Sequence, residues 1–244
     1  MTVRQRQADY PDTVMPASES TAADASHHRT VAAVLGSLAA ASLLDMATSE
    51  SLSLTDHAPS AAVVMFRVAD TYASPVALLT ALIGLVLWWQ RSNRSTRLVL
   101  DVTLVLAMIA LLDNVVGLVV CLFDKQDNPG FLLLSSAMVY LENIAVFAAF
   151  YWRFDHAHQH RVAAGEATHP GILFPHNTMS FKSLQGWCPG FVDYLFLSFN
   201  TSSTFGPTLP VPLRGPIQIG MMVQVAIAMA VLVMLAARAI GLIG

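Results

Sequence analysis

Residues 193–215, DYLFLSFNTSSTFGPTLPVPLRG, decide the architecture of this chain, together with the apolar run that follows them to Gly244. The stretch begins as a short amphipathic helix and continues into a turn that is rich in Thr and Ser around Gly206. Prolines then lead into the last apolar segment. Irregular backbone at membrane depth is tolerated only where protein buries it or where it lines a water-filled cavity. The order helix, turn, exit and span therefore predicts a re-entrant loop.

The amino-acid composition places most of the chain in a lipid bilayer. Hydrophobic residues make up 55% of the chain and charged residues only 12%, whereas soluble domains carry about 25% charged residues. The net charge of −3 predicts no nucleic-acid partner. The sequence contains no nucleophile elbow, no HExxH and no phosphate-binding or dinucleotide glycine loop. We therefore expect an integral membrane protein with lipid as its surroundings, without a cofactor and without enzymatic activity.

The apolar runs predict an all-α membrane protein with about five transmembrane helices and a re-entrant pore helix and loop before the last span. Asp45 interrupts the first run, and residues 61–72 form a candidate interfacial helix. Trp88, Trp89 and Trp152 mark span ends at the membrane interface. The predicted spans are 31–48, 73–90, 98–123, 131–153 and 216–242.

Four regions follow from this division. The first is a polar mobile tail and the second a helical membrane domain of four spans. A polar connecting segment that contains histidines comes third, and the pore helix, filter-like loop and final span come last. Their predicted bounds are 1–30, 31–153, 154–190 and 191–244.

The segment LFLSFNTSSTFGPTLP resembles the pore helix and filter of the potassium-channel superfamily. Thr201 and Thr204 have the spacing of the two filter threonines, and Phe205 and Gly206 match the next two positions. The resemblance implies passive transport of a small monovalent cation through an oligomer. Because one chain supplies one loop, the implied oligomer is a homo-tetramer. The expected ion pathway consists of Thr201, Ser202, Thr204, Phe205, Gly206, Pro207 and Thr208.

The sequence departs from that family directly after Gly206. Pro207 and Thr208 stand where the family has an aromatic residue and a second glycine. Stacked rings of carbonyls need residues that reach positive φ, whereas proline fixes φ near −65° and has no N–H. We expect a shorter site of hydroxyl and carbonyl oxygens. The alternative is a structural re-entrant loop in a membrane scaffold or sensor that conducts nothing.

A longer part of the chain is similar to a family of bacterial multi-span membrane proteins of unassigned function. The similarity is carried by YWRFD, LFPH, PGFVDYLFLSFNTSSTFGPT and AARAI. It implies a stable architecture and a bacterial inner membrane, and it implies no activity.

Membrane orientation follows from the turn that contains Arg91, Arg94 and Arg97. The positive-inside rule places this turn in the cytoplasm. With five spans, the N-terminus is then inside, the C-terminus outside, and the loop enters from the cytoplasmic side. Potassium-type pore loops enter from outside, so either the orientation is inverted here or the number of spans differs by one.

Two polar pairs lie inside the predicted spans: Asp113 with Asn114, and Glu142 with Asn143. Ionisable groups at membrane depth are costly and usually face the bundle interior. Antiparallel helices can bring the two pairs together. A hydrogen-bonded clamp between helices is the favoured interpretation, and an ion or proton relay is the alternative.

The HAHQH run supplies His156, His158 and His160 just beyond the fourth span. On a helix, His156 and His160 share one face and are candidate ligands for a transition metal. The alternative is a solvated or pH-responsive surface, because imidazole titrates near neutral pH.

Overall fold

The computed structural model describes residues 17–49, 60–123, 129–167, 169–179, 187–206 and 209–243. Within these ranges the chain is almost entirely helical, with one pair of two-residue strands. The α-helices are α1 (Ala17–Ser49), α2 (Ser60–Trp89), α3 (Asn93–Phe123), α4 (Pro129–Ala163), α5 (Phe191–Thr204) and α6 (Gly215–Ile243). The shorter elements are β1 (Ile172–Leu173), the 3-10 helix η1 (Pro175–Asn177) and β2 (Val211–Pro212).

Five of these helices, α1 to α4 and α6, are long and apolar enough to cross a membrane. The predicted fold class, all-α with about five spans, is therefore confirmed. The helices run further than the apolar runs from which they were predicted. Helix α1 begins at Ala17, inside the range assigned to the tail, and α4 continues to Ala163, inside the connecting segment. Polar residues can continue a helix beyond the bilayer, because hydropathy marks only its apolar part.

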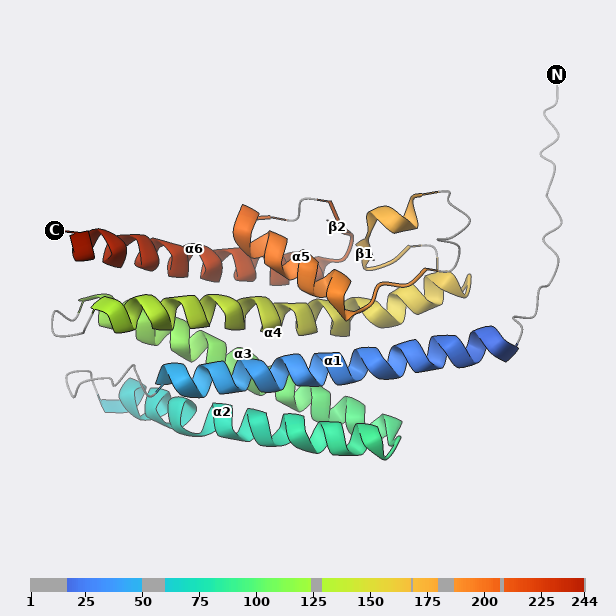
Figure 1. The fold of residues 1–244 in the computed structure, drawn as a ribbon, viewed down its shortest axis with the longest axis horizontal. Helices are drawn as coiled ribbons and strands as arrows, with labels where there is room; N and C mark the ends of the chain where they lie inside the picture. Colours follow the sequence, from blue (N-terminus) through green and yellow to red (C-terminus); the bar gives the residue numbers. More distant parts are fainter. Residues whose placement is uncertain are drawn as a thin grey trace, which may run out of the picture.

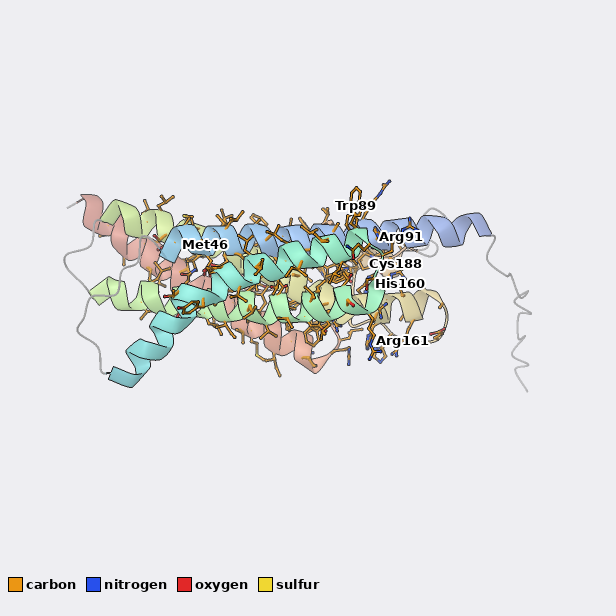
Figure 2. The ribbon with its side chains drawn as sticks, turned by 90° about the horizontal axis from the view of Figure 1, so that it is seen from below. Met46, Trp89, Arg91, His160, Arg161 and Cys188 are labelled. Atoms are coloured by element: carbon orange, nitrogen blue, oxygen red, sulfur yellow. The ribbon has the colours of Figure 1, made fainter. Side chains whose placement is uncertain are left out.

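The candidate interfacial helix 61–72 is part of α2, which is continuous through Pro75. Proline inside a helix removes one backbone hydrogen bond and commonly bends the helix. Figure 2 shows that α2 changes direction, so that its N-terminal part turns away from the bundle.

Helix α4 lies at the centre of the bundle and packs against α1, α3, α5 and α6, whereas α2 packs on α1 and α3 (Figure 1). Fully buried apolar side chains such as Leu35, Leu111 and Phe147 fill the space between the helices. Other leucines and valines point outward from the same helices. In a bilayer this outer surface is compatible with its surroundings, because lipid tails are as apolar as leucine.

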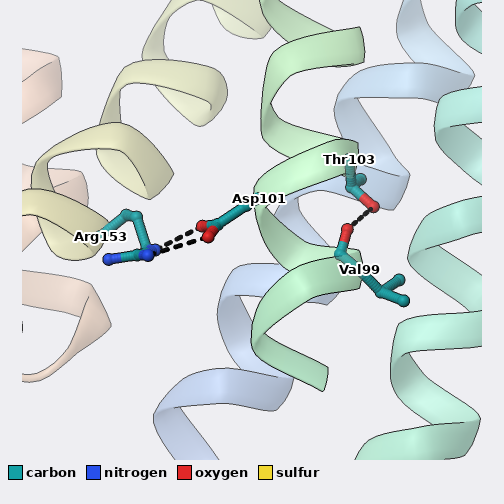
Figure 3. A network of polar contacts seen from close by, with 4 residues as sticks. All are labelled: Val99, Asp101, Thr103 and Arg153. Atoms are coloured by element: carbon teal, nitrogen blue, oxygen red, sulfur yellow. Dashed lines mark hydrogen bonds and ion pairs between the residues drawn. The ribbon is translucent and has the colours of Figure 1, made fainter. Parts of the chain in front are cut away.

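The basic end is our name for the end of the bundle that carries Arg91 and Arg161, while Met46 lies toward the other end (Figure 2). The α2–α3 turn and the C-terminal part of α4 lie at the basic end. Arg153 of α4 and Asp101 of α3 form a two-pronged ion pair there, with one N–O distance of 2.9 Å (Figure 3). Both side chains are 42% exposed.

Candidate functional site

Helix α5 enters the bundle at the basic end and runs along α4 toward the middle of the bundle. Near its start, the Tyr194 hydroxyl donates to Asp155 of α4 at 2.8 Å. Near its end, the Ser203 hydroxyl lies 3.1 Å from that of Tyr140, also on α4. About 22 Å of helix rise separates Asp155 from Tyr140, compared with about 30 Å for a hydrocarbon core. The C-terminal end of α5 therefore lies near the middle of the apolar part of α4.

The chain returns from this depth to the end at which it entered. Strand β2, which follows α5, pairs antiparallel with β1, with Ile172 opposite Pro212. The Leu213 N–H also donates to the Gly171 carbonyl at 2.8 Å. Since β1 follows the C-terminal end of α4, both ends of the α5 segment lie at the basic end (Figure 1). The segment is re-entrant, as the sequence predicts.

The sequence sets where α5 begins and ends. At its start, Asp193 accepts a hydrogen bond from the Gly190 N–H at 2.8 Å, which is a common way to cap a helix. At its end, Phe205 adopts the left-handed conformation, with φ 58° and ψ 32°. Glycine usually occupies this position, and a bulky residue there is strained. The strained residue stands at the turn that the sequence identifies as the filter-like segment.

The carboxylate of Asp155 fixes α5 and the connecting segment to α4. It accepts hydrogen bonds from the Ile172 N–H at 2.9 Å, from Gln159 at 2.8 Å and from Tyr194. Asp155 is completely buried. A Cβ added at Gly171 would lie 2.7 Å from its carboxylate, so only glycine fits this contact. The loop and the re-entrant helix thus depend on one carboxylate.

Half-buried Cys188 lies close enough to Asp155 for the charge of the carboxylate to act on its thiol. Burial raises the pKa of the Cys188 thiol, and the negative charge of Asp155 raises it further. In a Cys121→Ser protein we expect alkylation of Cys188 to reach half-maximal rate at a higher pH than in the same chain unfolded, because only the thiolate reacts. The measurement is the rate of iodoacetamide modification against pH, and equal midpoints for the folded and unfolded chains would contradict this prediction.

One face of α5 buries its hydroxyls against α4 and α6. The Ser198 hydroxyl donates to the Ile144 carbonyl at 2.7 Å, and the Gln224 amide of α6 donates to Ser198 at 2.7 Å and to Ser202 at 2.8 Å. From α4, the Asn143 amide approaches Ser202 at 3.3 Å and the Tyr151 hydroxyl donates to Gln224 at 2.5 Å. We call Asn143, Tyr151, Ser198, Ser202 and Gln224 the amide cluster.

The residues predicted for the ion pathway divide between the inside and the surface of the protein. Thr201 and Ser202 are fully buried, and the Thr201 hydroxyl donates to the Leu197 carbonyl at 2.8 Å. These two hydroxyls face the protein's own helices. Thr204 is exposed, Phe205 is 50% exposed and Gly206 is half-buried, whereas Pro207 and Thr208 lie outside the described residues.

A second polar group, the carboxyl clamp, joins α1, α3 and α4 at the same depth. The side-chain amide of Asn114 donates to Asp45 at 2.5 Å and to Glu142 at 3.0 Å. All three residues are at most 3% exposed. Two carboxylates buried beside one amide are costly unless a proton or a cation neutralises them. The clamp can therefore hold helices together and can also hold a proton or a cation.

The structure brings Asn114 and Glu142 together, as the sequence suggests for the two intramembrane pairs. Asn143, the next residue on α4, points to α5 and α6 instead, and Asp113 is half-buried. Consecutive residues of one helix point in directions about 100° apart, so Glu142 and Asn143 serve different neighbours. A polar layer thus crosses the middle of the bundle from α1 to α6.

Two residues of this layer, Asp45 and Gln224, carry no site prediction from the sequence. Asp45 interrupts the first apolar run, and Gln224 lies within the last one. A polar residue inside an apolar run was the available signal in both cases. Which helices they join depends on the packing, which a single sequence does not contain.

The histidine pair does meet on one face of α4. The rings of His156 and His160 lie 4.3 Å apart, and His156 stacks on Trp152. Among the residues that the structure describes, no group of three or more His, Cys, Asp or Glu side chains is placed to hold a metal ion. The metal site remains a prediction from the sequence.

Comparisons with protein-family models, with curated proteins and with solved structures found no match for this chain. Its class rests on the helices themselves: this is a multi-pass integral membrane protein with five candidate spans. Within that class, the re-entrant α5 and the polar layer beside it form the candidate functional site.

Proposed function

We propose that this membrane protein passes a small monovalent cation through an oligomer, with the exposed C-terminal end of α5 lining the path. The observation that carries the proposal is the depth of that end. A helix stops near the middle of the bilayer and leaves Thr204, Phe205 and Gly206 on or near the surface of the protein. The proposed lining begins at Thr204, because Thr201 and Ser202 face inward.

The chemistry at this helix end favours a cation. The last four carbonyls of a helix lack partners within the helix, and the C-terminus carries a partial negative charge. The Thr204 hydroxyl lies 2.7 Å from the Asn200 carbonyl oxygen and 2.8 Å from that of Gly206, so it can donate to either. Hydroxyl and carbonyl oxygens are the groups that replace water around an alkali cation in a filter.

The surroundings of the loop support an oligomer. Irregular backbone at membrane depth does not face lipid, and Phe205, where α5 ends, is exposed on a single chain together with Ser203 and Thr204. Copies of the chain around an axis would cover them and enclose an aqueous path. Four copies are the number that the resemblance to potassium-channel filters implies, and we propose a homo-tetramer.

A second candidate is a non-conducting membrane scaffold or sensor. The amide cluster favours it, because the hydroxyls of Ser198 and Ser202 are bound to α4 and α6 inside one chain. A loop that only supports the structure also needs its hydroxyls bonded to neighbouring helices of the same chain. Ion flux separates the two candidates.

We expect purified protein in liposomes to carry potassium or sodium flux that Gly206→Val reduces by at least about tenfold, because a branched side chain narrows a short oxygen-lined site. The matched control is Gly36→Val on α1. A Cβ added at either glycine meets nothing within 4 Å in the single chain, so the two positions are matched in the space next to the backbone. Flux is measured with an ion-sensitive dye, and the oligomeric state with native mass spectrometry.

Equal flux from Gly206→Val and Gly36→Val would remove Gly206 from the path. A monomer without flux in either cation gradient would contradict the pore and favour the scaffold. A tetramer whose flux is lost only in Gly206→Val is the result that the proposal requires.

A further inference from the structure

Two histidines that meet on α4 lie apart from the proposed ion path. His156 and His160 are four residues apart on one continuous helix, so their side chains share a face. Both side chains are half-buried. Figure 2 shows His160 at the basic end, where Arg91 and Arg161 also lie. The pair therefore lies at an end of the bundle that ions dissolved in water can reach.

Packing against Trp152 holds the first of the two rings. The rings of His156 and Trp152 are stacked, with centroids 4.9 Å apart and an angle of 24° between their planes. Trp152 is only 5% exposed and belongs to the hydrophobic core. A ligand that packing already orders loses less conformational entropy when it binds. His156 is therefore a preorganised ligand with His160 beside it.

The separation of the two histidine rings fits two ligands of one metal ion. A metal–nitrogen bond of about 2.1 Å puts the ion about 3.2 Å from the centroid of an imidazole ring. Two imidazoles on one such ion have centroids about 4.5 Å apart at a right angle and about 5.2 Å apart at the tetrahedral angle. The centroids of His156 and His160 are 4.3 Å apart, with an angle of 77° between the planes. The distance agrees with the right angle.

This angle and the number of ligands indicate which metal fits. Right angles between ligands are typical of square-planar copper(II) or nickel(II) and not of tetrahedral zinc. In the described part of the chain, no group of three or more His, Cys, Asp or Glu side chains is placed to hold a metal. Two imidazoles would therefore share the ion with water. Copper(II) has the highest affinity of the first-row divalent ions for a given set of nitrogen and oxygen ligands, so it suits a site with few ligands best.

We propose that His156 and His160 form a binding site for one copper(II) ion at the basic end. The site goes beyond the proposed ion pathway and does not depend on it. The two imidazoles act as a chelate from one face of α4, and Trp152 keeps the ring of His156 in place.

The test measures copper(II) binding to the full-length protein, purified without a histidine tag, by isothermal titration and electron paramagnetic resonance. We expect one ion per chain and coupling of its electron spin to two imidazole nitrogens. His156→Phe keeps an aromatic ring against Trp152 but supplies no nitrogen, and His160→Ala removes the other ligand. Each should weaken binding by at least about tenfold, since even the loss of a residue that only supports a metal ligand costs about 10- to 100-fold.

The matched control is His158→Ala. It removes an imidazole from the same run, but one that points about 200° away around the helix from His156, and binding should not change. Loss in His156→Phe and His160→Ala with retention in the control supports the site. Equal weakening in all three variants would show general binding to surface histidines and overturn it. Binding that survives both ligand substitutions, or zinc binding as tight as that of copper, would overturn it as well.

Discussion

Replacing Asn114 with Leu should destabilise the protein by about 3 kcal/mol, because it removes the shared donor from two buried carboxyl groups. The Asn114 amide donates to both Asp45 and Glu142. Hydrogen bonds between membrane helices average only about 0.6 kcal/mol each, so the loss of two such bonds would not reach this value. The larger effect comes from removing a buried donor that two buried acids share. The measurement is the melting temperature and unfolding free energy in detergent.

Asn200→Leu is the matched control, because Asn200 is only half-buried and its amide bonds to the Phe196 carbonyl of its own helix. We expect that substitution to change stability by less than about 0.5 kcal/mol. Adding Glu142→Gln to Asn114→Leu should recover part of the loss, because one uncompensated acid disappears. If Asn114→Leu is no more harmful than Asn200→Leu, the carboxyl clamp does not stabilise the fold.

The clamp also illustrates what the sequence could predict. An acidic residue in an apolar run signals a buried polar contact, and the sequence predicts the four intramembrane polar residues on that basis. The contact between Asn114 and Glu142 could be predicted, but the separate contacts of Asn143 could not. Glu142 and Asn143 are adjacent in sequence, yet one joins α3 and the other joins α5 and α6. Their direction depends on how α4 is rotated in the bundle, and hydropathy does not contain that information.

The re-entrant segment was also predictable only in part. Its order of helix, turn, proline-rich exit and span could be read directly, because each part has its own residue pattern. The inward direction of Ser202 could not be predicted, since it depends on Gln224 reaching this residue from α6. The pairing of β1 with β2 was also invisible, because two strands of two residues carry no periodic signal.

Replacing Asp155 with Ala should destabilise the protein by about 3–5 kcal/mol and release the connecting segment from α4. The substitution leaves the buried Ile172 N–H and the Tyr194 hydroxyl without their acceptor, while the Gln159 amide keeps only its bond to the Ile172 carbonyl. Each unsatisfied buried group costs about 1–3 kcal/mol. Hydrogen exchange should rise at the amides of β1 and in the first turn of α5, while the far half of α4 stays protected. Exchange mass spectrometry and thermal unfolding measure the two effects.

The control is Asp101→Ala, which breaks an ion pair whose partners are both 42% exposed. Because solvent screens such pairs, their loss costs about 0–1 kcal/mol, and exchange at β1 should not change. Asp155→Asn keeps one oxygen acceptor and should fall between the two. Equal effects of Asp155→Ala and Asp101→Ala would mean that α5 is held by its hydroxyl face alone. The expected order instead makes Asp155 the residue that fixes the entrance of the re-entrant helix, since Tyr194 in its first turn and Ile172 beside its exit strand both bond to this carboxylate.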